Sequence, residues 1–371
     1  MRPEQFLEVA VVQASAPLFD AVSGMEKACR LIVEAGASGA RLVVLPEAFV
    51  GGYPRGLSFG AVVGSRTREG RNLFARYHEG ALEVPGPGIE RLGAAARRAK
   101  AFVAVGVVER EAGHPGTLYC ALLYFGPDGT LLGRHRKLKP TASERLVWGE
   151  GDASGLTVLD TPFGRVGGLI CWENYMPLAR AALQRMGVTV HLAPTADARP
   201  AWQATMVHVA VEGRAFVLGC NQVTTKGDYP ADLLAHPEIQ ALPDVLCRGG
   251  SVIVSPLGDV VAGPVWDEER ILRARLDLRE VVRARLDFDA AGHYARPDVF
   301  RFEVPGLPEP ISCRPASEEG APAGGTDPRT RSRSTPASAA SSPAAAPPRR
   351  RRTPGRGSRR RPPASRRPGS P

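Results

Sequence analysis

The sequence predicts an α/β fold in which helices pack in layers on a mixed β-sheet. Two observations support this prediction. Short apolar runs alternate along the first three hundred residues with segments that carry apolar residues at helical spacing. Three further stretches place a Pro and a Gly between two apolar arms, which is typical of β-hairpins and adds antiparallel pairs to an alternating βα order.

Nine apolar runs are predicted to be strands. Several are unbroken series of Val, Leu and Ile, as expected for strands that are covered on both faces. In chain order they are Val9–Ala16, Leu42–Leu45, Phe102–Glu109, Leu118–Phe125, Val166–Ile170, Val188–Ala193, Phe216–Asn221, Ser251–Ser255 and Ile271–Leu276.

Four segments between these strands place apolar residues at i, i+3 and i+4 and are predicted to be helices. They are Gly24–Ala37, Ile89–Ala101, Pro177–Met186 and Trp202–Ala215. The turn after Cys171 is expected to enter its helix near Asn174, a residue type that caps helix N-termini. The three hairpins are expected at residues 122–138, 157–170 and 253–263.

The formal net charge of +10 is confined to the end of the chain. From Arg314 onward there are 14 arginines and 3 acidic residues, which leaves 34 basic and 35 acidic residues before it. We therefore predict one domain over residues 1–306 and a disordered, basic tail rich in Pro, Ala, Ser and Arg over 307–371. The tail is interpreted as a solvated extension in preference to a nucleic-acid-binding arm. The near-neutral body argues against a nucleic-acid partner.

The six cysteines are scattered and form no C-x-x-C pair, which fits a reducing compartment better than a disulfide framework. The N-terminus lacks a signal-peptide pattern, and no apolar run approaches the roughly 20 residues of a membrane span. We expect a cytoplasmic protein without a membrane partner. The seven histidines show no metal-binding motif, so neither a metal nor a cofactor is expected.

Three reactive side chains directly follow predicted strands. Glu47 follows Pro46 after the strand that ends at Leu45, Lys137 lies at the end of the second arm of the first hairpin, and Cys171 follows a buried strand. Because ligands in open α/β sheets bind at the carboxyl ends of strands, we expect these side chains to meet at one edge. A carboxylate accepts the thiol proton, and an ammonium stabilises negative charge that develops on a substrate.

Each of these residues also has a structural interpretation. A single buried cysteine is more often part of a core than a nucleophile, and charged side chains at strand ends are usually solvated. The residue types alone leave both interpretations open.

Four segments of the chain carry a family pattern. They are "LVVLPEAFVGGYP" with Glu47, "HRKLKPTASERLVWGEGD" with Lys137, "GGLICWENYMPLAR" with Cys171, and "GHYARPDVF" at Gly292–Phe300. In this order they resemble the nitrilase branch of the carbon–nitrogen hydrolases, and the resemblance spans residues 7–305.

The resemblance implies Cys171 as nucleophile, Glu47 as general base, Lys137 as acid and charge stabiliser, and Glu144 as a second glutamate that orders the lysine. Trp172 and Tyr53 become candidate substrate contacts. The third candidate contact is His135, which has the alternative interpretation of a surface hairpin residue. Cys29, Cys120, Cys220 and Cys247 are interpreted as core residues.

The resemblance further implies a four-layer αββα sandwich that forms homodimers or longer spirals. The expected reaction converts an organic nitrile and water into a carboxylic acid and ammonia through a cysteine thioimidate and thioester. Cyanide hydratase or dihydratase activity, or an amidase activity of the same superfamily, is the alternative. The "CWEN" sequence at the cysteine favours the nitrilase branch.

Overall fold

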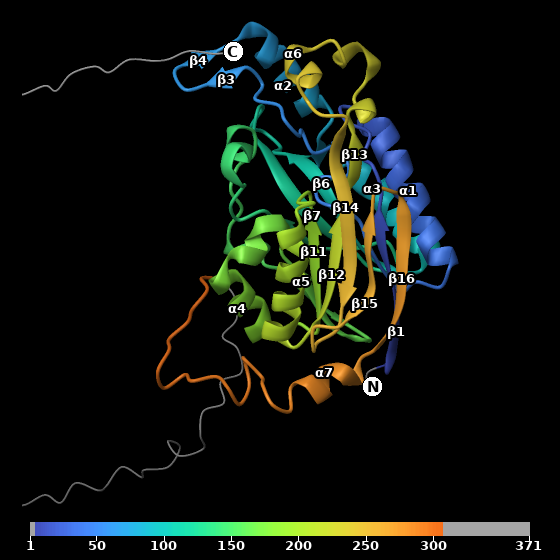
Figure 1. Cartoon of the computed structure of the whole chain (residues 1–371), viewed down its shortest axis with the longest axis vertical. Coiled ribbons are helices and arrows are strands. Elements are labelled where there is room, and N and C mark those ends of the chain that lie inside the picture. The colour runs from blue at the N-terminus through green and yellow to red at the C-terminus, as the bar shows by residue number, and fades with distance from the viewer. Residues whose placement is uncertain (1–3, 307–371) are drawn as a thin grey trace, which may run out of the picture. The chain divides into compact units, whose positions relative to one another are not determined.

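The computed structural model describes residues 4–306, so the predicted tail of residues 307–371 lies outside the described residues. Two mixed β-sheets of seven strands each dominate the fold (Figure 1). A small hairpin of β3 (Ala61–Val62) and β4 (Ser65–Arg66) stands apart from them.

The first sheet has the strand order β16-β1-β2-β6-β7-β8, with β5 also paired to β6. The strands β1, β2 and β6 run parallel to one another, whereas β16, β7 and β8 are antiparallel to their neighbours. Their bounds are β1 Phe6–Gln13, β2 Leu42–Val44, β5 Leu82–Glu83, β6 Phe102–Arg110, β7 Leu118–Phe125, β8 Leu131–Arg136 and β16 Arg270–Asp277.

The second sheet has the order β13-β14-β12-β11-β10-β9, with β15 also paired to β14. The strands β10, β11 and β12 are parallel, and the remaining pairs are antiparallel. Their bounds are β9 Val158–Thr161, β10 Gly164–Gly168, β11 Val190–Thr195, β12 Phe216–Asn221, β13 Val223–Thr225, β14 Val245–Val254 and β15 Val260–Trp266.

Helices cover the outer faces of both sheets. Leu92 of α3 and Ile32 of α1 pack with Val43 and Val105 of the first sheet, while Trp202 of α5 packs on the second. The α-helices are α1 Ala21–Ala37, α2 Arg68–Glu79, α3 Pro87–Ala99, α4 Pro177–Arg185, α5 Pro200–Gly213, α6 Pro237–Gln240 and α7 Arg279–Ala284. The 3₁₀ turns are η1 Ala142–Leu146, η2 Ala153–Gly155, η3 Cys171–Tyr175, η4 Lys226–Asp228 and η5 Ala231–Leu233.

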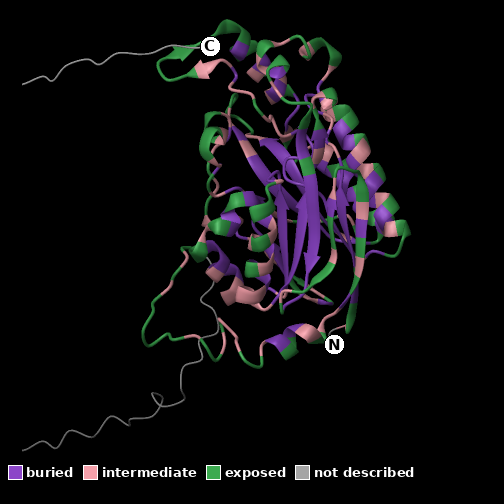
Figure 2. Cartoon of the chain, in the orientation of Figure 1, coloured by how far each residue is buried: buried purple, intermediate pink, exposed green. Residues whose placement is uncertain are grey.

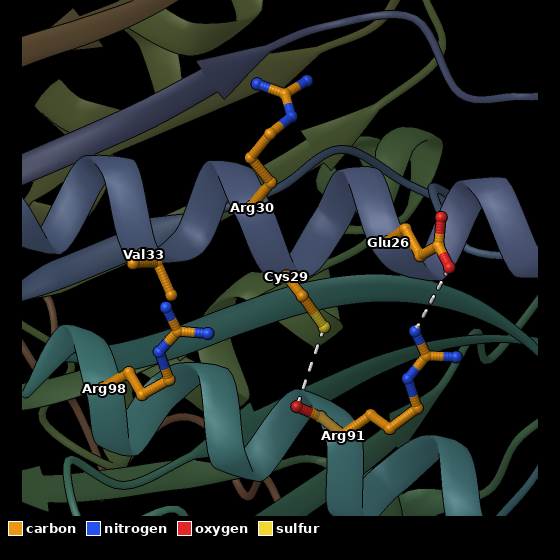
Figure 3. A pocket seen from close by; sticks show the side chains of 6 residues that line it. All are labelled: Glu26, Cys29, Arg30, Val33, Arg91 and Arg98. Atoms are coloured by element: carbon orange, nitrogen blue, oxygen red, sulfur yellow. Dashed lines mark hydrogen bonds and ion pairs between the residues drawn. The ribbon is translucent and has the colours of Figure 1, made fainter.

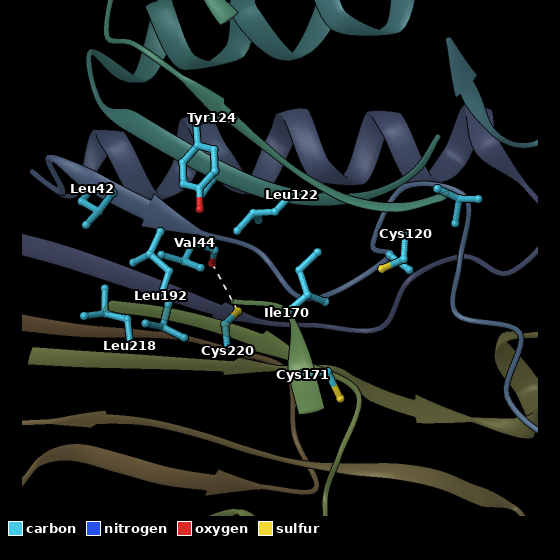
Figure 4. Close-up of a cluster of buried hydrophobic side chains, with 14 of the residues drawn as sticks. Leu42, Val44, Cys120, Leu122, Tyr124, Ile170, Cys171, Leu192, Leu218 and Cys220 are labelled. Carbon is cyan, nitrogen blue, oxygen red and sulfur yellow. Dashed lines mark hydrogen bonds between the residues drawn. The ribbon is translucent and has the colours of Figure 1, made fainter. Parts of the chain in front are cut away.

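The main core lies between the two sheets, where the strands are almost entirely buried (Figure 2). Val44 and Leu122 of the first sheet share one cluster with Leu192 and Leu218 of the second (Figure 4). Because both faces of each sheet are covered, its central strands alternate between two apolar environments, and their sequences are continuously apolar. This arrangement is the predicted αββα sandwich.

All nine predicted strands and all four predicted helices are present, and most of them have shifted ends. The three predicted hairpins are the antiparallel pairs β7–β8, β9–β10 and β14–β15. One local prediction is wrong, because Asn174 does not cap a helix. It lies inside η3 and donates hydrogen bonds to the carbonyls of Leu169 and Cys171. The helix instead begins at Pro177, which needs no N–H partner at that position.

Two loop regions pack against each other, one that carries Tyr53 and one at residues 226–242. The Glu238 carboxylate accepts hydrogen bonds from the Ser58 backbone N–H, at 2.8 Å, and from its hydroxyl, at 2.5 Å. The Tyr229 hydroxyl donates to the Arg55 carbonyl at 2.8 Å. The segment that carries Tyr53 is thereby tied to residues 226–242. Among residues 4–306, no helix is long and apolar enough to cross a membrane.

Candidate active site

Glu47 and Lys137 form a buried ion pair at the carboxyl ends of two strands. Glu47 lies three residues after β2, and Lys137 directly follows β8. Both side chains are completely buried, and Lys137 Nζ donates to Glu47 Oε1 at 2.7 Å. The close approach of the Glu47 segment depends on Gly106 of β6, because a Cβ there would lie 2.1 Å from the Pro46 carbonyl oxygen. The expected convergence of these two groups is therefore present.

Glu144 is the second carboxylate on the lysine. Its Oε2 accepts from Lys137 Nζ at 2.7 Å and from the Thr141 backbone N–H at 2.6 Å. Its Oε1 accepts from the Tyr53 hydroxyl at 2.7 Å. The ammonium group is thus held between two carboxylates, and Tyr53 fixes the orientation of the outer one.

Cys171 begins η3, three residues after Gly168, the last residue of β10. It is 5% exposed and has a φ of 52°, in the left-handed region that non-glycine residues rarely adopt. Such a backbone conformation is maintained only where surrounding contacts enforce it. Gly168 permits the close packing behind it, because a Cβ at Gly168 would lie 2.4 Å from the Leu192 carbonyl oxygen. The Thr195 hydroxyl, at the end of β11, donates to Cys171 Sγ at 3.1 Å.

Burial and charge set the protonation of the three reactive groups. Burial raises the pKa of the Cys171 thiol, and the nearby Glu47 carboxylate raises it further. Burial also raises the pKa of Glu47, against the opposing effect of the Lys137 ammonium. Burial disfavours the charge on Lys137, but the carboxylates of Glu47 and Glu144 outweigh it and raise the Lys137 pKa. The lysine is therefore a fixed cation, and the thiol needs a base to react.

One oxygen of Glu47 is free to receive a proton. Glu47 Oε2 is buried and has no hydrogen-bond partner within residues 4–306. The other oxygen, Oε1, accepts from Lys137 and faces the Cys120 thiol at 3.5 Å. A buried carboxylate oxygen without a partner is costly unless another molecule or the reaction uses it. This oxygen is therefore the atom of Glu47 that can accept a proton or a hydrogen bond from a water molecule.

The three candidate substrate contacts lie in different surroundings. Trp172 is 39% exposed, its indole N–H donates to Asp197 Oδ2 at 2.8 Å, and the Arg199 guanidinium lies over its ring. Tyr53 contacts Glu144 and packs edge-on against Trp148.

His135 is not a surface residue, which corrects that interpretation. It is fully buried, and its two ring nitrogens bond the Gly155 carbonyl and the Glu173 carboxylate. Both polar atoms of the ring are therefore occupied by protein groups. The sequence pattern did not place His135 correctly, because a hairpin arm shows the same pattern whether another segment covers it or it faces solvent.

Four residues near the reactive groups were not identified from the sequence as parts of the site. Thr195 contacts the thiol, Asp197 holds Trp172, Cys120 faces Glu47, and Trp148 lies beneath the Lys137 ammonium at 5.9 Å from the ring centre. Thr195 could have been identified from the sequence, because it closely follows a predicted strand and ligands bind at the carboxyl ends of the strands of such a sheet. Cys120 lies inside a strand, and only the tertiary structure distinguishes it from an ordinary core cysteine.

A hollow of about 330 Å³ lies between α1 and α3, away from these groups. The residues that line it are Glu26, Cys29, Arg30, Val33, Arg91 and Arg98 (Figure 3). These helices cover the outer face of the first sheet, whereas Cys171 belongs to the cluster between the sheets. Within residues 4–306 no group of three or more His, Cys, Asp or Glu side chains has the arrangement of a metal site.

Comparison with known proteins identifies the family of this chain. The family model for carbon–nitrogen hydrolases matches residues 8–286. An aliphatic nitrilase of Sinorhizobium fredii is 52% identical over 81% of this chain and 96% of its own length. The bifunctional nitrilase/nitrile hydratase NIT4A of Lupinus angustifolius is 48% identical over 84% of this chain and 90% of its own length.

Solved structures show the same fold at lower identity. Nit3 of Saccharomyces cerevisiae, a nitrilase-superfamily member, superposes with a TM-score of 0.61 at 22% identity, over 79% of this chain and 98% of its own. The relatives of high identity are named as nitrilases, so the amidase and cyanide-hydrolysing alternatives are not favoured. The chain therefore belongs to the carbon–nitrogen hydrolase family, in its nitrilase branch, and is an enzyme that acts on nitriles.

Proposed function

We propose that Cys171, Glu47 and Lys137 carry out the hydrolysis of an organic nitrile to its carboxylic acid and ammonia. The observation that carries this proposal is the buried cluster in which Glu47 contacts Lys137, keeps Oε2 without a hydrogen-bond partner within residues 4–306, and is near enough to Cys171 for each to shift the other's pKa. A thiol whose pKa burial has raised reacts only if a base removes its proton, and Glu47 is the base at hand.

The first half of the reaction forms a covalent bond to sulfur. Glu47 takes the Cys171 proton as Sγ attacks the nitrile carbon, and the nitrogen receives a proton to give a neutral thioimidate. Negative charge that develops on the nitrogen lies near the Lys137 ammonium, which stabilises it at no cost of reorganisation. The thiol hydrogen thus ends on nitrogen, and the carbon gains one bond to sulfur while losing one to nitrogen.

The second half consumes two water molecules. Glu47 activates the first water, which adds to the thioimidate carbon and gives a tetrahedral intermediate that carries S, N and O. Protonation of the nitrogen releases ammonia and leaves a thioester. The second water attacks the thioester and releases the carboxylic acid, and Sγ recovers its proton.

The remaining residues position these groups. Glu144 and Tyr53 hold the Lys137 ammonium through the contacts described above. Trp172, fixed by Asp197, is proposed to line the substrate pocket.

A second product, the amide, is proposed as a minor outcome. It forms when the tetrahedral intermediate expels Cys171 Sγ instead of ammonia. This proposal is supported by the plant relatives at 47–49% identity that are named bifunctional nitrilase/nitrile hydratase.

We also propose that the enzyme works in the cytoplasm as a homodimer or a longer spiral that associates through its helical layers. Leu178, at the start of α4, is 68% exposed, and the neighbouring Tyr175 is also exposed, which supports this layer as a contact surface. Light scattering of the parent and of Leu178→Asp tests the association, since a smaller particle is expected for the variant.

The cytoplasmic location is supported by the cysteines, which are free and therefore compatible with a reducing compartment. They are Cys29, Cys120, Cys171, Cys220 and Cys247.

The main test compares three substrates in parallel. A nitrile, its corresponding amide and cyanide are supplied to the enzyme, and acid, amide and ammonia are each quantified. Acid and ammonia in equal amounts from the nitrile, with a minor share of amide, are expected. Mass spectrometry of the quenched enzyme should show an adduct on Cys171, and Cys171→Ala should lack both the adduct and turnover. Turnover of the amide or of cyanide in preference to every nitrile would overturn the assignment.

A further inference from the structure

Glu173 and His135 form a second buried ion pair, which the reaction steps above do not use. Glu173 lies two residues after Cys171 in η3, and His135 lies two residues before Lys137 in β8. Neither side chain has any exposed surface, and His135 Nε2 lies 2.9 Å from Glu173 Oε2. The pair therefore links the segment of the proposed nucleophile to the segment of the proposed ammonium.

The Glu173 carboxylate also binds the backbone of both segments. Its Oε2 accepts from the N–H of Ile170, the residue before Cys171, at 2.6 Å. Its Oε1 accepts from the N–H of Leu138, the residue after Lys137, at 2.6 Å. One rigid group thus fixes the distance between two chain segments that are more than thirty residues apart in sequence.

The contacts of His135 require a proton on each ring nitrogen. Nε2 faces a carboxylate, and Nδ1 lies 3.0 Å from the Gly155 carbonyl oxygen. Both partners are acceptors, so both nitrogens donate and the ring is an imidazolium. Burial disfavours that charge, but the Glu173 carboxylate outweighs it, so the pKa of His135 lies above its ordinary value.

The neighbouring titratable groups leave the pair isolated. Arg134 and Arg136 precede and follow His135 in β8 but bond Glu109 through the other face of the sheet. The phenol of Tyr124, on the adjacent β7, is near enough to Glu173 for the carboxylate to influence it, and burial raises the pKa of Tyr124 so that it stays neutral. The carboxylate that acts on His135 is therefore Glu173.

We propose that His135 and Glu173 are positioning residues: the imidazolium keeps Glu173 ionised and oriented, and Glu173 holds the Cys171 and Lys137 segments at their reacting separation. This inference rests on the proposed roles of Cys171 and Lys137. Loss of the His135 proton removes one of its two hydrogen bonds and loosens the carboxylate. Turnover should therefore fall as the pH rises through the pKa of His135, while the substrate pocket keeps its shape.

His135→Gln is the decisive variant, because the glutamine amide N–H can still donate to Glu173 but does not titrate. At pH 7 we expect kcat to fall about 10-fold and KM to stay within about 2-fold of the parent. The decline of kcat at alkaline pH, which titration of His135 causes in the parent, should be absent from the variant. Glu173→Gln places an amide N–H against one of the two backbone donors, so kcat should fall about 100-fold or more. The double variant should match Glu173→Gln, because the two residues act as one unit.

The control is His208→Gln, which removes a histidine of α5 that is 63% exposed. Its pH profile should be that of the parent. A His135→Gln enzyme with the parental kcat and alkaline limb would overturn the proposal. So would a lowered melting temperature with unchanged kcat per folded molecule, because that result marks a purely structural role.

A measurement on the unaltered enzyme covers the case in which the variants do not fold. In ¹⁵N spectra of histidine-labelled enzyme recorded as the pH rises, one imidazole should remain doubly protonated above the ordinary histidine pKa of about 6.5. Spectra in which every histidine has become neutral by that pH would overturn the proposal. Cys171→Ala tests the chemical steps independently, so the two proposals fail separately.

Discussion

Lys137 is a charged residue whose side chain is completely buried, and its two carboxylate partners explain how that burial is tolerated. An unpaired ammonium would lose its proton there, whereas Glu47 and Glu144 hold it at 2.7 Å each. Two carboxylates around one ammonium leave a net negative charge at the site. Burial raises the pKa of Glu47 and the Glu144 carboxylate raises it further, which makes Glu47 a stronger base than an exposed glutamate.

Lys137→Ala should retain the fold but lose turnover by about 10²- to 10³-fold, because no cation remains to stabilise charge on the substrate nitrogen. Glu47 and Glu144 would share a proton in its absence, which limits the cost to the fold. The measurement is kcat together with far-ultraviolet circular dichroism. Lys139→Ala is the matched control, since that lysine is exposed and pairs with Glu150. Near-parental turnover by a natively folded Lys137→Ala enzyme would remove Lys137 from the mechanism.

The burial of His191 leads us to expect that the free energy of unfolding falls at acid pH. Its Nε2–H donates to Asn174 Oδ1 at 2.8 Å, and burial together with the Arg180 charge lowers the pKa of His191 to about 4. The unfolded chain binds this proton below about pH 6.5, whereas the folded protein does not until about pH 4. The unfolded state therefore gains stability as the pH falls through this window.

The contribution of His191 to this loss should be about 2 kcal/mol between pH 7 and pH 5. Denaturant titrations at both pH values measure it for the parent, for His191→Gln and for the exposed control His208→Gln. The His191→Gln enzyme should lose about 2 kcal/mol less than the other two. Equal losses in all three proteins would show that His191 does not titrate in this range.

At the scale of elements, the reactive groups are placed by strand ends and by glycines that let strands approach. Gly106 of β6 is the clearest case, because an added Cβ would meet the Pro46 carbonyl oxygen at 2.1 Å and the Glu47 Cα at 2.7 Å. These atoms belong to the backbone and cannot rotate away. Gly168 of β10 has the same relation to β11 behind Cys171.

Gly106→Ala should displace Glu47 and lower kcat about 10-fold or more, by analogy with other small misplacements of catalytic groups. Gly227→Ala is the control, since a Cβ there meets nothing closer than 3.5 Å and the backbone is not left-handed. Steady-state kinetics and thermal melts of both variants separate the effect on the site from the effect on stability. A Gly106→Ala enzyme with parental kcat would show that the Glu47 segment tolerates the shift.

At the scale of the whole molecule, polar side chains bridge the two sheets near the site. Gln13, at the end of β1, donates to the Val265 carbonyl and accepts from the Ser251 N–H of β14. The thiol of Cys220, on β12, contacts the Val12 carbonyl in the first sheet. It also contacts the Val44 carbonyl of that sheet (Figure 4). These contacts fix the separation of two sheets that each supply part of the site, since Glu47 and Lys137 follow strands of one and Cys171 follows a strand of the other.

Removal of residues 314–371 should leave nitrile turnover within about 2-fold of the parent. Every proposed catalytic group lies between Glu47 and Thr195, and the core is formed by residues before 285. The truncated chain should also lose any retention on nucleic acid, since the 14 arginines beyond residue 313 carry the basic excess. Kinetics and a nucleic-acid filter-binding assay measure both. Loss of activity by a folded truncated enzyme would contradict the predicted domain boundary.

The sequence by itself determined nine of the strands, four of the helices and three hairpins, because these features depend on local periodicity and turn residues. Its resemblance to the nitrilase branch, through motifs of fixed spacing, indicated Glu47, Lys137, Glu144 and Cys171 as the expected site residues. The tertiary structure alone decided which side chains meet. The covering of β8 turned His135 from an expected surface residue into half of a buried ion pair. The approach of β7 placed the Cys120 thiol beside Glu47. Such contacts depend on how separate strands pack in three dimensions, and a pattern that repeats every two or every 3.6 residues contains no information on that packing.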